Sequence, residues 1–161
     1  MSNPDPHDPL TPIEMQPIGV VRNGITDAVD RGWGAVESRI ELRPDLVGAL
    51  EGLETFSHAL VLTWLHEAPP PPGLRRRPQG RAEFPELGIL AQRARYRPNP
   101  IAVSAVSIVA VEPGALIVRG LDVIDGTPVL DLKPYIGPFD RVEAPRVPDW
   151  ARRLYEEESY F

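Results

Sequence analysis

The frequency of proline is the feature that most constrains the fold of this chain. Twenty of its 161 residues are proline. A proline inside a helix costs about 3 kcal/mol, because it lacks the amide hydrogen and clashes with the preceding turn. Long helices are therefore disfavoured over most of the sequence. A chain of this length is expected to form one domain that buries roughly 70 % of the surface its unfolded state exposes. The sequence predicts a single, mostly β domain.

Several segments have the side-chain patterns of β-strands. Residues 36–42 alternate apolar and polar side chains, which indicates a strand with one face in water. Residues 57–65 form a nearly continuous apolar run, which suits a strand covered on both faces. Other apolar runs predict further strands, for six or seven in all, at residues 17–22, 88–93, 101–111, 116–119 and 129–132.

The run at residues 101–111 differs from the others. Its side chains are apolar or small at both odd and even positions, so both faces of the strand are expected to be covered. In a small β protein, one face of such a strand can line a barrel interior and the other can form a subunit interface.

Helical structure is expected only in short pieces. Residues 44–54 suggest a turn with one or two helical turns. Near the C-terminus, Asp149 has the side chain of an N-cap, and it is followed by Trp150, Ala151 and Leu154 at helical spacing. This pattern predicts a short C-terminal helix that docks Trp150 on the body of the protein.

The remaining composition narrows the class of protein. The chain has no cysteine, which excludes disulfides, thiolate catalysis and cysteine-ligated metals. No stretch reaches the ~18 apolar residues of a membrane span. Residues 1–14 are polar and rich in proline, unlike a signal peptide. We expect residues 1–14 to be a disordered leader, residues 15–161 to be the folded domain, and the protein to be cytoplasmic.

Positive charge is concentrated in one part of an acidic chain. The net charge is −6, yet residues 75–97 contain seven arginines and only two glutamates. Such a segment suggests local recognition of an anion, and a solvated loop is an equally good interpretation for residues 75–81. Residues 68–86 also contain four consecutive prolines, so this stretch is expected to be a mobile excursion between strands.

The arginine-rich segment ends in a proline-braced corner. Pro98 and Pro100 restrict Arg97 and Asn99, the residues before them, to extended conformations. The two polar side chains are therefore oriented before a ligand arrives, which lowers the entropic cost of binding. We interpret Arg97 and Asn99 as site residues that either contact a ligand or organise the loop that does.

Four blocks, in this order, resemble a known family. The blocks are Pro17-Ile18-Gly19-Val20-Val21, then Gly52-Leu53-Glu54-Thr55-Phe56-Ser57-His58 running to Trp64-Leu65-His66, then Arg97-Pro98-Asn99-Pro100-Ile101, and finally residues 120–135. Together they resemble the β-barrel, S-adenosylmethionine-dependent tRNA methyltransferases, whose characterised members methylate N6 of threonylcarbamoyl-adenosine beside the anticodon. The resemblance implies a closed, mixed β-barrel with short helical excursions, a homodimer, S-adenosylmethionine as cofactor and tRNA as substrate.

The resemblance also implies where the cofactor binds. By position, the cofactor-binding residues are Trp33, Gly34, His66, Glu67, Arg93, Arg95, Leu121, Asp122, Val123 and Ile124. Arg93 and Arg95 suit either the cofactor carboxylate or an RNA phosphate, and exposed charges on a strand are the alternative. Trp33 is a candidate for stacking on adenine, or else a surface tryptophan that anchors a loop or a dimer contact.

Three residues of the last block are candidates for catalysis. Methyl transfer to a delocalised N6 benefits from a nearby base, typically by about 10²–10⁴-fold, and Asp125, Asp131 and Tyr135 are the candidates. Asp125 precedes Gly126 in a turn dipeptide, so it is also interpreted as a turn residue. Lys133 either pairs with Asp131 or contacts a phosphate or carboxylate, and Tyr135 either stacks on a base or closes the end of the barrel.

The histidines do not predict a metal site. His58 and His66 lie eight residues apart, about 26 Å along an extended strand, and His7 lies in the leader. We interpret His58 as a buried, hydrogen-bonded residue and His66 as a cofactor contact.

The leading hypothesis is a methyltransferase acting on modified adenosine in tRNA. The alternatives are an enzyme of the same fold that acts on a small molecule or another RNA, and a non-catalytic module that binds the cofactor or RNA.

Overall fold

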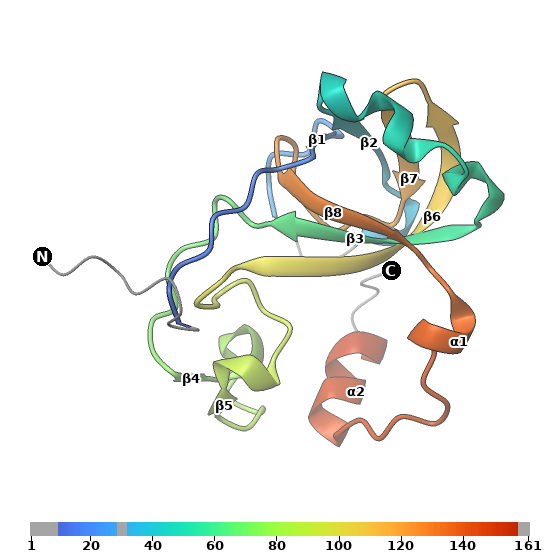
Figure 1. The fold of residues 1–161 in the computed structure, drawn as a ribbon. Coiled ribbons are helices and arrows are strands. Elements are labelled where there is room, and N and C mark those ends of the chain that lie inside the picture. Colours follow the sequence, from blue (N-terminus) through green and yellow to red (C-terminus); the bar gives the residue numbers. More distant parts are fainter. Residues whose placement is uncertain (1–9, 29–31, 158–161) are drawn as a thin grey trace, which may run out of the picture.

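The centre of the fold is a closed barrel of six strands. The computed structural model describes residues 10–28 and 32–157. The barrel strands follow the order β1-β2-β7-β6-β3-β8 (Figure 1). Their bounds are β1 Gly19–Arg22, β2 Glu37–Leu42, β3 His58–Trp64, β6 Ile101–Glu112, β7 Ala115–Arg119 and β8 Pro128–Pro134. The predicted closed, mostly β barrel is confirmed.

The barrel strands all pair in the antiparallel sense, where the family resemblance had implied a mixed barrel. Each of the six neighbouring pairs is antiparallel. An even number of strands can alternate in direction around a closed barrel without leaving a parallel pair. Parallel neighbours would also need crossover connections of a dozen or more residues. The expectation of a mixed barrel was therefore wrong in this detail.

Alternation along the strands fills the barrel interior. In β3, Ala59, Val61 and Thr63 are buried, whereas the residues between them are only partly covered. These residues line the same core as side chains from the other five strands. The buried core cluster consists of Val21, Ile40, Leu50, Ala59, Val61, Val106, Leu116, Val118, Leu121, Val123 and Val129.

Strand β6 is covered on one face only within the chain. Ser104 and Val106 are buried, whereas Val103 and Val109 are each 44 % exposed. The expectation that both faces of this strand are covered therefore does not hold for a single copy. The outer face of β6 continues onto β3, where Val103 lies beside Leu62.

Strands β1 and β2 approach closely at a glycine. A Cβ atom at Gly19 would lie 2.4 Å from the backbone oxygen of Glu41 on β2. Only a residue without a side chain allows this pairing at its observed separation.

An arm, defined here as residues 65–100, connects β3 to β6 and lies beside the barrel (Figure 1). It contains a two-stranded sheet of β4 (Arg75–Arg76) and β5 (Leu87–Gly88), with the 3₁₀ helices η4 (Pro78–Gly80) and η5 (Ile89–Ala91). The strand expected at residues 88–93 is thus only two residues long, and a 3₁₀ turn follows it. The expected excursion is folded around Phe84 and Ile89, which are 1 % and 5 % exposed.

The other helices are short, as predicted. The 3₁₀ helices η1 (Trp33–Ala35), η2 (Pro44–Leu50) and η3 (Leu53–Thr55) lie between the early strands, and α1 (Gly137–Asp140) follows β8. The C-terminal helix α2 spans Asp149–Glu157 and buries Ala151 and Leu154. Asp149 is its first residue and forms an ion pair with Arg152. No helix among the described residues has the length and apolarity needed to cross a bilayer.

Most of the predicted leader lies outside the described residues, which begin at residue 10. Residues 12–15 form neither helix nor strand, and Ile13 is 83 % exposed.

The strand directions place three connecting segments at one end of the barrel, which we call the loop end. β3 finishes there at Trp64, and β6 and β8 begin there, because Trp64 pairs with Ile101 and Thr63 pairs with Val129. The connections that meet at the loop end are therefore residues 23–36, the arm, and residues 120–127. This is the left side of the barrel in Figure 1.

Candidate functional site at the loop end of the barrel

The loop end brings together the two segments that the sequence singles out. The Ser104 hydroxyl, on β6 just after the proline-braced corner, donates a hydrogen bond to the Asp122 carboxylate. The Leu65 backbone N–H donates to the Pro100 carbonyl at 2.8 Å. The corner at residues 97–100 and the segment at residues 120–126 therefore lie at the same end of the barrel.

The segment at residues 120–126 offers its backbone as well as its side chains. Leu121 and Val123 are 0 % and 3 % exposed and belong to the barrel core. Within the described part of the chain, the backbone N–H groups of Leu121, Val123 and Ile124 donate to no protein acceptor. Unpaired N–H groups in an interior are costly and are normally satisfied, so these donors suit a bound ligand.

Asp125 holds the neighbouring loop in place. Its carboxylate accepts hydrogen bonds from the backbone N–H groups of Asn23 at 2.8 Å and Gly24 at 3.0 Å. These bonds, first that from Gly24 and then that from Asn23, lower the pKa of the Asp125 carboxyl below its usual value, and the Arg22 guanidinium lowers it further. A carboxylate stabilised in this way is a weaker base. The structure favours the structural interpretation of Asp125.

Asn23 completes this contact between loops. Its side-chain amide donates to the Val123 carbonyl at 2.9 Å and to the Ser38 hydroxyl at 3.1 Å. Asn23 and Ser104 were not among the site residues predicted from the sequence. The one available signal for Asn23 was its position before Gly24 at the end of a strand, which is typical of a turn residue.

Trp33 packs inward at the start of η1. It is 3 % exposed, so the alternative of a surface tryptophan was wrong. It follows Gly32, whose φ of 77° begins the 3₁₀ turn and suits glycine. Gly34 follows and is half-buried. Residues 29–31, which precede this turn, lie outside the described residues.

The predicted arm residues are anchored by contacts within the chain. The Arg93 guanidinium donates to the Val103 carbonyl at 2.7 Å, at the edge of β6. Arg97 donates to the Gln92 carbonyl, which agrees with its interpretation as a loop-organising residue. The Asn99 side chain is exposed, and its backbone oxygen accepts from Ile101 at 2.7 Å. Arg95 stacks on Tyr96.

His66 and Glu67 follow β3 directly at the loop end. His66 Nε2 lies 3.7 Å from Glu67 Oε1, and the two side chains are 32 % and 68 % exposed. Both therefore stand at the surface where a ligand bound to this end would meet water.

The three catalytic candidates do not lie together in one copy of the chain. Asp125 is at the loop end, whereas Asp131 lies on the outer face of β8, paired with Lys133 at 2.7 Å. Tyr135 follows β8 at the other end of the barrel, beside His58. The seven residue-to-residue steps from Pro128 to Tyr135 span about 23 Å in a strand. The period-two pattern grouped Asp131 and Lys133 on one face, but it did not indicate which end of the barrel Tyr135 occupies.

His58 is exposed, so the interpretation as a buried histidine was wrong. It is hydrogen-bonded, however: Nδ1 lies 2.8 Å from the Ser57 hydroxyl, and Nε2 lies 3.3 Å from the Ser107 hydroxyl. Its ring also meets the Tyr135 ring edge-on at 6.4 Å. In the part of the chain that the structure describes, no group of three or more histidine, aspartate or glutamate residues is placed to hold a metal ion.

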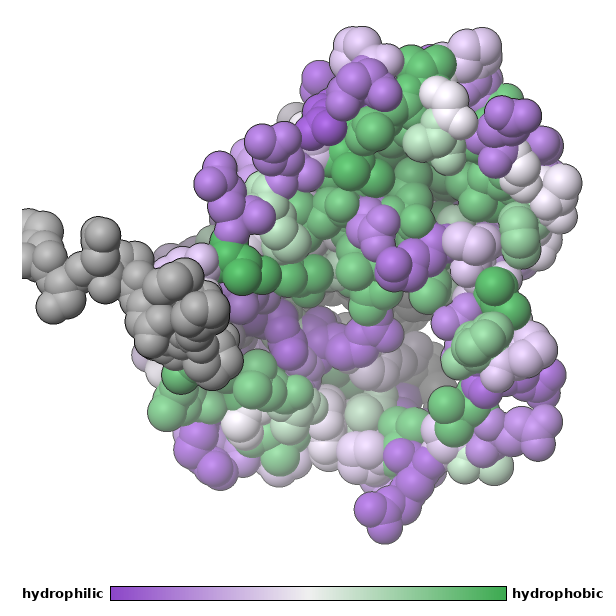
Figure 2. All heavy atoms as spheres, viewed as in Figure 1, coloured by the Kyte–Doolittle hydropathy of each residue, from purple (hydrophilic) through white to green (hydrophobic). Residues whose placement is uncertain are grey.

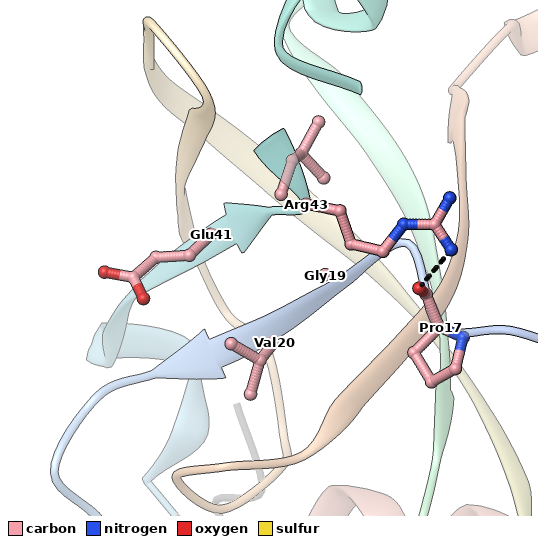
Figure 3. Close-up of a pocket in the computed structure, with 6 residues that line it drawn as sticks. Pro17, Gly19, Val20, Glu41 and Arg43 are labelled. Atoms are coloured by element: carbon pink, nitrogen blue, oxygen red, sulfur yellow. Dashed lines mark hydrogen bonds between the residues drawn. The ribbon is translucent and has the colours of Figure 1, made fainter. Parts of the chain in front are cut away.

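A second surface feature lies away from the loop end. A shallow hollow of about 360 Å³ is lined by the start of β1 and the end of β2 (Figure 3). The Arg43 guanidinium reaches across it to the Pro17 carbonyl and forms a two-bond pair with Asp45. The Glu41 carboxylate, which also lines the hollow, pairs with Arg22 and Arg39. The charged side chains of the hollow are thus paired within the chain, and none of the predicted site residues lies in it.

Comparison with known proteins gives the family of this barrel. A family model described as the tRNA-methyltransferase O N-terminal domain matches residues 30–141. A Methanothermobacter thermautotrophicus protein named a probable S-adenosyl-L-methionine-binding protein is 41 % identical over 133 residues, which are 80 % of this chain and 93 % of that protein. A Pseudomonas aeruginosa protein named a putative S-adenosylmethionine-dependent methyltransferase is 40 % identical and is covered over 59 % of its length.

Solved structures agree with this match. The crystal structure of TrmO from P. aeruginosa superposes with a TM-score of 0.72 at 35 % identity, over 88 % of this chain and 62 % of that one. A mouse protein named a tRNA (adenine(37)-N6)-methyltransferase is 38 % identical over 92 residues, or 21 % of its length. The chain therefore belongs to the family of the tRNA-methyltransferase O N-terminal domain. It spans about 60 % of the Pseudomonas proteins and nearly all of the archaeal one.

Proposed function

We propose that this protein is an S-adenosylmethionine-dependent methyltransferase that binds its cofactor at the loop end of the barrel and methylates an adenine N6 in tRNA. One observation carries the proposal. Three segments that resemble the family's cofactor-binding positions meet at the loop end, and one of them has backbone donors that no described protein group accepts. A tRNA substrate would place the protein in the cytoplasm.

The residues at the loop end fit the chemistry of the cofactor. Backbone N–H groups of Leu121, Val123 and Ile124 suit the acceptor atoms of an adenine or a ribose. A guanidinium suits the carboxylate of the methionine part, and Arg93 is anchored at this end through the Val103 carbonyl. Gly34 supplies a backbone without a side chain next to the same loops. Trp33, which is 3 % exposed, would contact the cofactor only through the small part of its ring that reaches the surface. His66, Glu67 and Asp122 complete the polar rim.

In the proposed mechanism, the main task of the protein is to position the methyl donor and the acceptor; reactive side chains contribute less. Bound S-adenosylmethionine supplies an activated methyl group on a sulfonium. The loop end would hold the acceptor in line with that methyl, and alignment of this kind is worth roughly 7–11 kcal/mol in favourable cases. The hydrogen bonds that tie Asn23 and Gly24 to Asp125 fix two of the loops relative to each other before a ligand binds.

We place the proposed catalytic role of Asp131 and Tyr135 in a homodimer. The outer face of β3, β6 and β8 exposes apolar side chains, including Ile101 and Val103 at 37 % and 44 %. Packing two copies through this face would cover these side chains and present Asp131, Lys133 and Tyr135 of one copy to the other. Replacement of Val103 by aspartate is expected to convert a dimer to a monomer in analytical ultracentrifugation.

The finer substrate proposed is threonylcarbamoyl-adenosine. Labelled cofactor would be incubated with bulk tRNA from a strain that lacks this protein. Label in tRNA that disappears when threonylcarbamoylation is blocked supports this acceptor. Label that persists in tRNA supports another adenine, and label found only in small metabolites contradicts the tRNA assignment.

The cofactor site has its own test. Asp122→Asn is expected to weaken S-adenosylmethionine binding about tenfold or more in calorimetry, because a hydrogen bond to a charged group contributes about 1.5–3 kcal/mol. Asp45→Asn, which removes a carboxylate at the opposite end of the barrel, is the matched control and should bind normally. Equal affinities for the two variants would contradict the placement of the cofactor.

A cofactor-binding protein without transferase activity is the second candidate. The archaeal relative that this chain covers almost completely is named only as a binding protein. Tight cofactor binding with no methyl acceptor in RNA or metabolite pools would support this alternative.

A further inference from the structure

Arginine side chains on the barrel surface lie next to carboxylates. Arg22 pairs with Glu41 at 3.4 Å, Arg43 with Asp45 at 3.0 Å and Arg119 with Glu37 at 3.4 Å. Arg39 pairs with both Glu41 and Glu112. Each positive charge on the barrel surface is therefore balanced locally by a negative one, and little of its field extends into solvent.

The arginines of the arm are held mostly by neutral groups. Arg75 donates to the Glu86 carbonyl at 3.0 Å, and Arg77, Arg93 and Arg97 donate to the carbonyls of Phe84, Val103 and Gln92. Arg76 and Arg95 stack on Tyr96. Among the described residues, only Arg81 of the seven has a carboxylate within ion-pair distance, that of Glu83.

A neutral anchor fixes a guanidinium without cancelling its charge. Guanidinium carries five N–H donors, and a single carbonyl occupies one or two of them. The remaining donors keep the fork geometry that matches a phosphate. Neutral anchoring also removes part of the entropic cost of ordering a long side chain at an interface.

Two of these guanidinium groups, those of Arg76 and Arg95, lie close to the ring of Tyr96. Its ring lies 4.0 Å from the Arg76 guanidinium carbon and 5.3 Å from that of Arg95, and Arg95 also donates to the Tyr96 hydroxyl at 3.3 Å. The pKa of Tyr96 is lowered by this hydrogen bond and by the charge of Arg95, and then by Arg76. We call Arg76, Arg95 and Tyr96 the Tyr96 cluster.

The arm stands in a fixed place next to the loop end. Both ends of the arm, at residues 65 and 100, lie at the loop end. The middle of the arm contacts α2, where the Arg153 guanidinium lies 5.6 Å from the Phe84 ring. Figure 1 shows the arm beside α2 and below the barrel, and Figure 2 shows hydrophilic side chains gathered along the boundary between barrel and arm.

We infer that the Tyr96 cluster binds the sugar-phosphate backbone of the RNA whose base enters the loop end. This inference rests on the proposed function and assigns Arg95 to RNA phosphate, whereas Arg93 remains with the cofactor carboxylate. Fixed guanidinium groups match phosphates, and a tyrosine ring next to them suits a nucleotide better than a carboxylate-bearing protein surface. The arm thereby adds an RNA-binding surface next to the loop end of the barrel.

The test is the salt dependence of tRNA binding by the whole chain. Removing one phosphate contact lowers the slope of log K against log[salt] by about 0.7–0.9 and weakens binding about fivefold at 0.15 M salt. The double variant Arg76→Gln, Arg95→Gln should bind unmodified tRNA about 25-fold more weakly, with the slope reduced by about 1.4–1.8. An unchanged affinity for S-adenosylmethionine in this variant would support Arg95 as a phosphate contact, whereas a comparable loss would return Arg95 to the cofactor and overturn the inference.

Two further variants separate a contact from a general effect. Arg39→Gln, Arg43→Gln removes the same charge from the barrel and should leave tRNA affinity and slope near those of the unaltered protein. Arg76→Lys, Arg95→Lys keeps the charge and should recover most of the affinity, which a collapsed arm would not do. Equal losses in the arm and barrel variants would overturn the inference.

Other outcomes distinguish the inference from the proposed function. Binding to phosphatidylserine vesicles that falls in the arm variant while tRNA affinity stays constant would assign the surface to a membrane and overturn the inference. Methyl transfer to tRNA that is unaffected in the arm variant would overturn the inference and leave the proposed function standing. Binding of tRNA through the arm without any methyl transfer would support the inference and contradict the proposed function.

Discussion

The barrel and the arm are stabilised in different ways. The barrel combines six paired strands with a shared apolar core. The arm has a sheet of two two-residue strands and relies on side chains that bond to backbone carbonyls, such as Arg77 to Phe84 and Gln92 to Arg76. One region is therefore expected to unfold as a cooperative unit, whereas the other can open locally. From this difference we expect that the proposed RNA surface can be altered without loss of the proposed cofactor site.

The largest effect is expected from emptying the centre of the arm. Phe84 is 1 % exposed, and removal of a buried phenylalanine ring costs about 3–5 kcal/mol. Phe84→Ala should raise hydrogen exchange in peptides from residues 70–97 while peptides from β3 and β6 remain protected. Phe139→Ala is the control, because Phe139 is 85 % exposed. Loss of protection throughout the barrel would show that the two regions are one cooperative unit.

The next effect tests the barrel. Gly19→Ala places a Cβ atom against the Glu41 backbone oxygen, and overpacking of this kind costs about 1–3 kcal/mol. The melting temperature should fall. Cofactor binding and the folded structure of the arm should be lost in the same transition as the barrel. At Gly137 an added Cβ atom meets nothing within 4 Å, so Gly137→Ala should melt normally. A normal melting temperature for Gly19→Ala would contradict the described pairing of β1 and β2.

A smaller, pH-dependent effect is expected at the link between two loops. The pKa of Asp125 is lowered in the folded protein, so its carboxylate stabilises the fold above the unfolded pKa, and this contribution is lost as the pH falls through the folded pKa. Asp125→Ala should lower the melting temperature at pH 7, and the difference from the unaltered protein should shrink below about pH 4. A difference that stays constant down to pH 2 would show that the carboxylate charge is not involved.

The smallest effect is expected from a surface ion pair of the barrel. Arg119 and Glu37 are each about half exposed, and exposed pairs contribute about 0–1 kcal/mol. Arg119→Gln should therefore change stability by less than 1 kcal/mol in urea unfolding, with a smaller effect at high salt. A loss of more than about 1 kcal/mol in the free energy of unfolding would contradict the expectation that this exposed ion pair contributes little to stability.

The sequence predicted the barrel well because periodicity reports burial. The strand at residues 36–42 was visible from the alternation of Ser38 and Ile40 with charged neighbours, and the structure buries both side chains. The arm has no such period. Its order depends on contacts such as that of Gln92 with the Arg76 carbonyl, sixteen residues away. Bonds of this kind leave no mark in local composition, so a folded arm was predicted as a mobile excursion.

The candidate site was predicted in part. The family resemblance grouped three segments, and the strand directions explain why these segments meet at one end. Asp125 and Tyr135, however, are ten residues apart in sequence and lie at opposite ends of β8. A side-chain pattern gives the face of a strand, but only the full topology gives the end of the barrel at which that strand finishes.

The hydrogen bond from Asn23 to Asp125 joins residues 102 positions apart. Contacts over such separations form late, because most of the polypeptide must already be ordered around them. A nascent chain would consequently acquire ligand affinity only when its first and last strands have met, and added S-adenosylmethionine would select for finished molecules over partly folded ones.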